Sequence, residues 1–399
     1  MKAINIKEGV YWVGARDPEL RVFDIVMETV YGTTYNAYLV VGEKVALIDT
    51  VKERCYEQLV EKISEIVPVA EIDYIIANHT EPDHSGSLAR LLKETPKAQV
   101  LGSKPALMFL KEIVNFDFNQ RVVAHGEELD LGGKTLKFIS APFLHWPDSM
   151  FTYLKEDKLL CPCDAFGCHY CSEEMFNDLV ADDMSDAFKY YFDVIVSPFR
   201  NYVLEAAEKI KDLEIDIIAP SHGPILRQDP WSYVEKYAGW SRREEDLTRQ
   251  KSVPVIYTSA YGNTARLAGK IAQGLEESGV KTELLELGKV TDAEIIARIE
   301  AAPGFLIGSP TINRDAVPPV WYLLALVSAI TNKGKPAAAF GSYGWSGEAV
   351  KLIEQRLSGL QLKVGLPGLR VNFVPTEKSL DEAREFGKSF AGVIKGENS

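Results

Sequence analysis

Four potential metal ligands occur within six residues, in the segment His79-Thr80-Glu81-Pro82-Asp83-His84. The segment begins at the end of IDYIIANHT (72–80), an apolar run that is typical of a buried strand and ends in polar residues. Imidazole nitrogens and carboxylate oxygens are common ligands of transition metals. The segment therefore predicts a metal site at the end of a strand.

Three more potential ligands lie further along the chain, each where a predicted strand ends. They are His145 in FLHWPD, Asp164 in CPCDAF and His222 in APSHGP. A single histidine usually lies on the surface or is a satisfied core residue, but four of the six histidines fall in these segments. We therefore interpret the seven residues as one constellation.

The mix of ligands predicts a pair of ions. Two multivalent cations a few ångströms apart repel each other, so a shared carboxylate is needed between them. We expect Asp164 to be this bridge. The remaining ligands divide into His79, Glu81 and His145 on one ion, and Asp83, His84 and His222 on the other.

The other histidines and the cysteines are weaker candidates. His125 and His169 have no ligands at a suitable spacing, and we expect them to be ordinary residues. A Cys-x-Cys and a Cys-x-x-Cys pair could bind zinc or an iron–sulfur cluster, through Cys161, Cys163, Cys168 and Cys171. Asp164 lies inside this cluster and the first pair has strand spacing, so a thiolate site stays a less favoured alternative.

A second constellation has residue types that suit a flavin phosphate and ring. The loop at 258–264 joins a strand to a helix, and its hydroxyls and helix N-terminus suit a phosphate monoester. It lacks the lysine pattern of nucleotide hydrolases and Gly-x-Gly-x-x-Gly. Two later loops, at 308–314 and 341–347, follow apolar strands; we expect Trp345 to stack on a flat ring, with Thr311 and Asn313 at its edge. The predicted binding residues are Thr258, Ser259, Ala260, Tyr261, Gly262, Asn263, Thr264, Pro310, Thr311, Ile312, Asn313, Arg314, Ser342, Tyr343, Gly344, Trp345, Ser346 and Gly347.

The elements around these residues predict two domains. Residues 1–250 have many short β-runs, including the pair YNAYLVV and KVALIDT and the later run VVAHG, and an α-helical stretch that FDVIVSPFR interrupts. The charged segment 241–254 marks the boundary. Residues 251–399 alternate strands with helices at 264–278, 292–301, 319–331 and 347–358. This alternation predicts a doubly wound parallel sheet of order 2-1-3-4-5.

Charge is divided unevenly between these domains. The net charge is -13, and residues 251–399 contain 17 basic and 15 acidic residues, which leaves -15 for residues 1–250. Such an acidic first domain argues against nucleic acid as a partner. The sequence has neither an apolar run of membrane-spanning length nor a signal-peptide core, and its five cysteines do not form a disulfide framework. We expect a cytoplasmic protein that does not bind membranes.

The order of the metal segments resembles the metallo-β-lactamase superfamily, whose zinc hydrolases have His-x-His-x-Asp-His at the first motif. Glu81 stands at the second histidine position, which is the signature of the flavodiiron proteins, and an oxygen donor there favours iron over zinc. Residues 253–395 resemble flavodoxin. The resemblance implies an α/β fold, with a metallo-β-lactamase-like αββα sandwich followed by a flavodoxin-like doubly wound sheet. It also implies two iron ions, FMN, and reduction of nitric oxide to nitrous oxide, of dioxygen to water, or of both.

The same resemblance implies partners. The electron donor would be rubredoxin or a rubredoxin-type flavoprotein, and the chain would form a head-to-tail homodimer or a dimer of dimers. Asp24, Tyr191 and Tyr202 are candidate neighbours of the irons. Because an acidic donor would be repelled by the first domain, we expect it to dock near the flavin loops, steered by Arg266 and Arg314.

Two other functions remain open from the sequence. One is a zinc-dependent hydrolase of the same fold, acting on a thioester or lactone, with the flavodoxin-like domain as a passenger. The other is a flavin electron carrier whose metal domain is disused, although the complete ligand set argues against it. Bound iron and a flavin spectrum would exclude the hydrolase.

Overall fold

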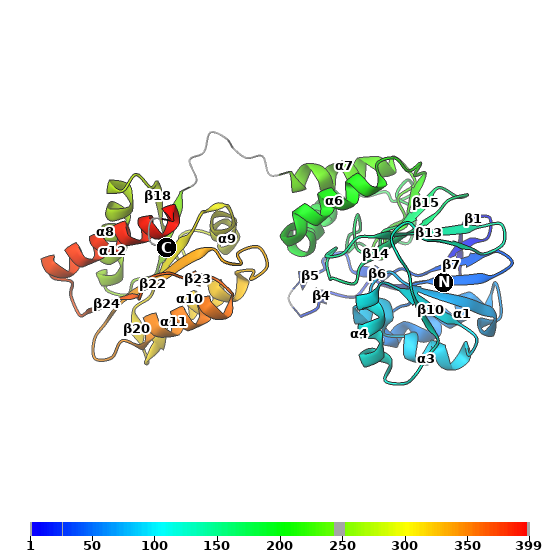
Figure 1. Ribbon diagram of the computed structural model, residues 1–399, viewed down its shortest axis with the longest axis horizontal. Coiled ribbons are helices and arrows are strands. Elements are labelled where there is room, and N and C mark those ends of the chain that lie inside the picture. The colour runs from blue at the N-terminus through cyan, green and yellow to red at the C-terminus, as the bar shows by residue number, and fades with distance from the viewer. Residues whose placement is uncertain (1, 26, 243–251, 397–399) are drawn as a thin grey trace. The chain divides into compact units, whose positions relative to one another are not determined.

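The computed structural model describes residues 2–25, 27–242 and 252–396. Its contacts divide the chain into two compact units, Met1–Arg243 and Glu244–Ser399, each with its own core (Figure 1). The predicted boundary between residues 250 and 251 lies outside the described residues. Within the described ranges, no helix is both long enough and apolar enough to cross a membrane.

The first unit is built on two sheets. The larger sheet has the order β1 (Ile4–Lys7), β2 (Val10–Trp12), β7 (Tyr38–Val41), β8 (Val45–Ile48), β9 (Ile72–Ala77), β10 (Gln99–Gly102) and β11 (Gln120–Val122). The smaller sheet has the order β12 (Glu128–Asp130), β13 (Thr135–Ser140), β14 (Met150–Leu154), β15 (Leu159–Cys161) and β16 (Ile217–Ile218). Two short hairpins pair β3 (Ala15–Asp17) with β6 (Thr33–Tyr35) and β4 (Val22–Phe23) with β5 (Met27–Glu28). The predicted pairing of YNAYLVV with KVALIDT is confirmed, since β7 and β8 are antiparallel.

Helices cover the outer faces of both sheets. One outer layer contains α1 (Tyr56–Ser64), α3 (Leu88–Glu94) and α4 (Lys104–Val114), and the opposite layer contains α6 (Arg200–Ile210) and α7 (Pro230–Ser241) (Figure 1). The inner faces of the sheets share a buried apolar cluster that includes Trp12, Ile48 and Phe138. The predicted αββα sandwich is therefore confirmed.

Helix α4 shows how local sequence sets these boundaries. Ser103 accepts a hydrogen bond from the Ala106 N–H at its N-terminus, and Asn115 ends it in the left-handed region. Leu107, Leu110 and other apolar residues at helical spacing are buried on one face. The helix therefore packs against the sheet.

Two expectations for this unit were wrong. The segment FDVIVSPFR does not interrupt the helices: after α5 (Ser185–Tyr191), a π-helix (Phe192–Val196) and a 3-10 turn (Ser197–Phe199) lead into α6. Phe192, Val196 and Phe199 are buried from a helical backbone, and Pro198 stands in a first turn, where no N–H is needed. Of VVAHG, only Val122 lies in a strand. The remaining short elements are two 3-10 turns (Glu53–Cys55 and Val69–Glu71) and α2 (Pro82–Ser85).

The second unit has the predicted sheet order. Parallel strands run β18 (Thr282–Glu286), β17 (Val253–Tyr257), β19 (Phe305–Gly308), β22 (Pro336–Tyr343) and β23 (Lys363–Val364), which confirms the order 2-1-3-4-5. The fifth position is shared, because β24 (Leu369–Asn372) also pairs with β22. One face packs against α9 (Asp292–Ala301), α10 (Pro318–Leu326) and α11 (Glu348–Gly359), and the other against α8 (Asn263–Glu277) and α12 (Glu377–Lys395). A small hairpin joins β20 (Thr311–Ile312) to β21 (Asp315–Ala316).

The helices of this unit differ from the prediction in two places. The helix expected at 319–331 ends at Leu326, and Ser328 then caps a turn by accepting hydrogen bonds from the N–H groups of Ile330 and Thr331. Helix α12 was not predicted. It buries Leu380, Phe390 and other apolar residues on the face that α8 shares.

Candidate metal centre and flavin loops

The segment 79–84 forms a tight turn where β9 ends. Glu81 is the N-cap of α2, Pro82 occupies its first turn, and the His84 N–H donates to the Glu81 carbonyl at 2.8 Å. Proline at a helix start fixes the backbone without losing a needed hydrogen bond. The turn therefore brings four potential ligands together: His79, Glu81, Asp83 and His84.

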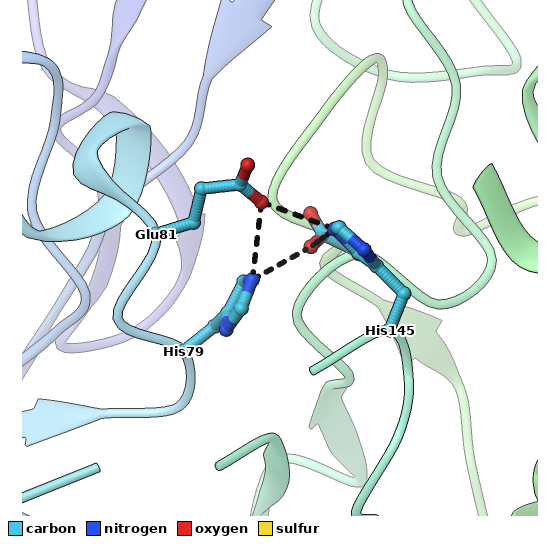
Figure 2. A group of neighbouring side chains, drawn as sticks. His79, Glu81 and His145 are labelled. Atoms are coloured by element: carbon cyan, nitrogen blue, oxygen red, sulfur yellow. Dashed lines mark hydrogen bonds and ion pairs between the residues drawn. The ribbon is translucent and has the colours of Figure 1, made fainter. Parts of the chain in front are cut away.

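The first group consists of His79, Glu81 and His145, whose side chains point toward one another (Figure 2). Glu81 Oε2 lies 3.3 Å from His79 Nε2 and 3.1 Å from His145 Nε2. Both imidazole Nε2 atoms lie 3.6 Å from Asp164 Oδ2. The His79 side chain is fully buried, whereas that of His145 is 18% exposed, so the group opens to solvent on the His145 side.

The second group consists of Asp83, His84 and His222, all buried. Asp83 Oδ2 lies 3.3 Å from His84 Nε2 and 3.1 Å from His222 Nε2. These Nε2 atoms lie 3.3 and 3.4 Å from Asp164 Oδ1. Each carboxylate oxygen of Asp164 therefore faces a different group.

The unsatisfied polar atoms test whether this arrangement suits metal ions. Both carboxylate oxygens of Asp83, both of Asp164 and His84 Nε2 are buried without a hydrogen-bond partner. Leaving such groups unpaired costs several kcal/mol in total, by roughly 1–3 kcal/mol each. Cations at the centre would give a partner to Asp83 Oδ2, to His84 Nε2 and to both oxygens of Asp164, so the residues fit a two-ion centre.

The charges of the groups are mutually stabilised. Burial alone would raise the pKa of Asp164, but the imidazoles of His84, His79 and His222 hold it well below its usual range. Burial would likewise lower the pKa of His84, but Asp83 and Asp164 raise it to about 9. Without metal, the imidazole is therefore protonated at neutral pH, and a bound cation would displace that proton.

Hydrogen bonds fix two of the imidazoles from behind. His79 Nδ1 donates to Asp148 Oδ2 at 3.0 Å, and His222 Nδ1 donates to the Thr34 carbonyl at 2.6 Å. Because both acceptors lack a proton, Nδ1 carries the hydrogen and Nε2 remains free for a metal.

The loop that carries His222 is held by β6 and β7. Asn36 donates from Nδ2 to the carbonyls of Pro220 and Gly223 at 2.7 and 2.9 Å, and the Tyr38 hydroxyl also donates to Pro220 at 2.6 Å. Gly223 has a φ of +82°, and a Cβ there would lie 2.6 Å from the Cys168 carbonyl. Glycine is therefore required immediately after His222.

His169 lies against the second group, which corrects the expectation that it is an ordinary residue apart from the metal segments. Its ring centroid is 4.8 Å from His222, 4.9 Å from Tyr191 and 4.3 Å from Phe23. Its Nδ1 lies 2.7 Å from the Thr33 hydroxyl, and its Nε2 is buried without a partner. No ligand spacing marks His169 in the sequence, so only the fold places it here.

The three candidate neighbours lie in different positions. Tyr191 is buried, and its ring centroid is 6.1 Å from His222. Asp24 lies next to Glu81; burial and a hydrogen bond with Glu81 raise the pKa of Asp24 to about 6. The ring of Tyr202 packs on Phe143, two residues before His145.

The cysteines do not form a thiolate site in the described part of the chain. All five are free thiols. Cys163 joins Asp49 and His84 in one buried group of possible ligands, but no described group combines two cysteines. Burial raises the pKa of the Cys163 thiol well above its usual value, which disfavours a thiolate. His125 is exposed and accepts a hydrogen bond from the Ser140 N–H.

The three predicted flavin loops converge at the ends of β17, β19 and β22. The hydroxyls of Thr264 and Ser342 are 2.8 Å apart and join the first loop to the third. Arg314 donates from Nε to Glu348 at 2.9 Å, which joins the second loop to the start of α11. The three loops therefore form one rim at the carboxyl edge of the sheet.

This rim presents two exposed aromatic rings beside a helix N-terminus. Tyr261 is 91% exposed and Trp345 is 87% exposed. Gly262, with a φ of +79°, is the N-cap of the 15-residue helix α8. Asn313 has a positive φ in the exposed turn between β20 and β21. Exposed aromatic rings near free helix N–H groups suit a phosphorylated ring compound.

Comparisons with known proteins agree with both units. The ODP family beta lactamase model matches residues 33–223, and the Flavodoxin model matches residues 255–387. Flavo-diiron protein FprA2 of Clostridium acetobutylicum is 43% identical over 400 residues, covering 99% of this chain and 100% of the relative. A nitric oxide reductase of Moorella thermoacetica is 39% identical and covers 98% of each chain. The solved rubredoxin oxygen:oxidoreductase from Desulfovibrio gigas matches with a TM-score of 0.70, 30% identity and 99% coverage of each chain.

Proposed function

The chain belongs to the flavodiiron proteins, and from this premise we propose that it reduces nitric oxide to nitrous oxide, dioxygen to water, or both. The reaction would take place at two iron ions in the first unit, with electrons delivered through FMN in the second. The nitric oxide reductase and oxygen:oxidoreductase names of its relatives support this activity.

The geometry of Asp164 is the observation that carries the proposal. Its Oδ2 faces His79 and His145, and its Oδ1 faces His84 and His222, with all four distances between 3.3 and 3.6 Å. We propose that Asp164 bridges the ions, with His79, Glu81 and His145 on one and Asp83, His84 and His222 on the other. Bound there, iron supplies a one-electron valence change at each ion, which zinc cannot.

The protein's own residues would hold the reacting gas in a dry site. Phe23, Tyr191 and the other rings around His169 and His222 bury the second group. The partly exposed side chain of His145 leaves the first group nearer to solvent. We propose that gas and protons enter from this side.

Glu81 favours this function over the zinc hydrolase. Its carboxylate lies between two imidazoles at 3.1 and 3.3 Å, so each position would have an oxygen donor besides Asp164. Oxygen donors favour oxidised iron, whereas zinc sites prefer nitrogen and sulfur. Neither the hydrolase nor the disused metal domain is supported by the relatives' names.

We propose that FMN binds the rim formed by the loops at 258–264, 310–314 and 342–347. Its phosphate would take the start of α8, and Trp345 would stack on its ring. A rubredoxin-type protein is the proposed electron donor, as the name of the Desulfovibrio gigas relative indicates for that protein. We also propose that the chain forms a head-to-tail homodimer or a dimer of dimers and is located in the cytoplasm. The five free thiols are consistent with a reducing compartment.

Metal and flavin analysis tests the proposal. Protein produced with ample iron should contain about two irons and about one FMN per chain, and should consume one or both gases with a reduced donor. Stoichiometric zinc in its place, with thioester or lactone hydrolysis, would support the alternative instead.

A further inference from the structure

The two groups of the candidate centre have the same ligand charge. With metal bound, each would contribute two neutral imidazoles and one carboxylate, and each faces one oxygen of Asp164. The ligands alone therefore do not distinguish the two positions. Besides the partial exposure of His145, the two groups differ in the atoms behind the ligands.

The hydrogen bonds behind the imidazoles differ in charge. His79 of the first group donates to the Asp148 carboxylate at 3.0 Å, and both side chains are fully buried. His222 of the second group donates to the neutral Thr34 carbonyl. An anionic acceptor pulls the Nδ1 proton more strongly and makes Nε2 a better donor to a metal.

We propose that Asp148 makes the two iron positions unequal: through His79 it strengthens iron binding at the first position and makes that iron harder to reduce than the second. The inference rests on the proposed di-iron function. It names Asp148 as a positioning residue, because the carboxylate acts through His79 and not on the metal itself.

The surroundings of Asp148 hold its carboxylate in place. Oδ2 also accepts hydrogen bonds from the Thr80 N–H and hydroxyl, both at 2.8 Å, and the Ser103 hydroxyl donates to the Asp148 carbonyl at 2.7 Å. Trp146 packs edge-on against His79, with centroids 5.2 Å apart. Four separate interactions therefore hold the contact between His79 and Asp148 in place. Because both side chains are fully buried, water does not screen it.

Asp49 offers a matched control, because it is a second buried carboxylate close to the centre. Its Oδ1 accepts from the Asn78 N–H at 2.8 Å and from the His79 N–H at 3.4 Å. Both donors are backbone groups, not an imidazole. Asp49 is therefore a buried carboxyl group close to the centre, in one group with His84, without the hydrogen bond to an imidazole on which the proposal depends.

The test compares Asp148→Asn, Asp148→Glu and Asp49→Asn in the full chain. Asparagine keeps an acceptor oxygen and removes the charge, whereas glutamate keeps the charge. Anomalous diffraction at the iron edge would give the occupancy of each position, and a redox titration followed by electron paramagnetic resonance would give the order of reduction.

The expected result is specific to one position. Asp148→Asn should weaken iron binding at the His79 position by about 10- to 100-fold and raise its reduction potential, while the second position stays filled. Asp148→Glu should restore both properties, and Asp49→Asn should not reproduce the loss. Equal occupancies and unchanged potentials in Asp148→Asn would overturn the inference, as would the same selective loss in Asp49→Asn. Wild-type protein without iron at either position would instead refute the proposed function.

Discussion

The carboxylate of Glu81 lies 3.1 Å from the Nε2 atom of His145, on the side of the centre that is nearest to solvent. This carboxylate replaces the imidazole that zinc hydrolases of the same fold have at this position. Replacing Glu81 with His should shift metal preference from iron to zinc and lower gas reduction by more than about 10-fold, with FMN still bound. Metal analysis and turnover check this together. Retained iron with near-normal turnover would show that the carboxylate does not select the metal.

Removing Asp164 should empty both positions. Within the described residues, alanine there deletes the only side chain whose two oxygens face both groups, and the remaining imidazoles and carboxylates could not offset repulsion between two ions. Iron content should fall to well below half in Asp164→Ala. Asp178→Ala removes a carboxylate that pairs with Arg227 on the surface and serves as the control. Full iron at both positions in Asp164→Ala would exclude the bridging role.

Iron binding should strengthen as pH rises. The pKa of His84 is raised to about 9 by Asp83 and Asp164 in the metal-free protein, so the ring must lose a proton to bind metal at neutral pH. Affinity should increase by about tenfold per pH unit for each proton released, and the contribution of the His84 proton should end above about 9. Ferrous titrations from acidic to alkaline buffer measure this slope. An affinity that does not change with pH below about pH 9 would mean that the metal does not displace a proton from His84.

Trp345 should contribute to flavin affinity. It is 87% exposed on the rim of the flavin loops, and stacking against a flat ring would bury it. Trp345→Ala should weaken FMN binding by about tenfold, or about 1.4 kcal/mol. Tyr322→Ala removes another exposed aromatic ring of the same unit, on α10, and should leave FMN affinity unchanged. Equal losses in both variants would argue against stacking by Trp345.

Arg266 should steer the electron donor more strongly than Arg314. Arg266 is exposed, whereas Arg314 is paired with Glu348 at 2.9 Å, which offsets its charge. Reversing Arg266 to Glu should slow flavin reduction by an acidic donor, more at low salt than at high salt. Stopped-flow mixing across an ionic-strength series would show this, and oxidation of pre-reduced enzyme by gas should not change. Unaltered rates of flavin reduction in both Arg266→Glu and Arg314→Glu would place the docking site of the donor elsewhere.

The sheet order of the second unit was predictable, because local sequence determines it. Strands β17, β18 and β22 are each followed directly by a helix, and β19 by a small hairpin and then a helix. Right-handed crossovers then leave few alternatives. Helix α12 was missed although Leu380, Ala383, Gly387 and Phe390 recur at the spacing of an amphipathic helix, a pattern that was available in the sequence. The helical path through 192–199 was missed because an apolar β-branched run reads as a strand when its burial is unknown.

The candidate ligands could be identified from the sequence because their residue types are rare and cluster at strand ends. The residues behind them could not. Asp148 contacts His79 across 69 residues of sequence, and Thr34 contacts His222 across 188. Asp148 lies in the segment FLHWPD that contains His145, but nothing in the sequence indicates that it contacts His79. Thr34 and His169 lie in no distinctive motif. Tertiary packing alone brings these residues to the centre.

Anaerobic turnover with each gas tests the central claim most directly. Purified protein with iron and FMN, supplied with a reduced rubredoxin-type donor, should consume nitric oxide, dioxygen or both, and Asp164→Ala with FMN bound should consume neither. Nitrous oxide or water should be the product. If the iron-loaded protein consumed both gases no faster than the Asp164→Ala variant, this chain would not be a gas reductase.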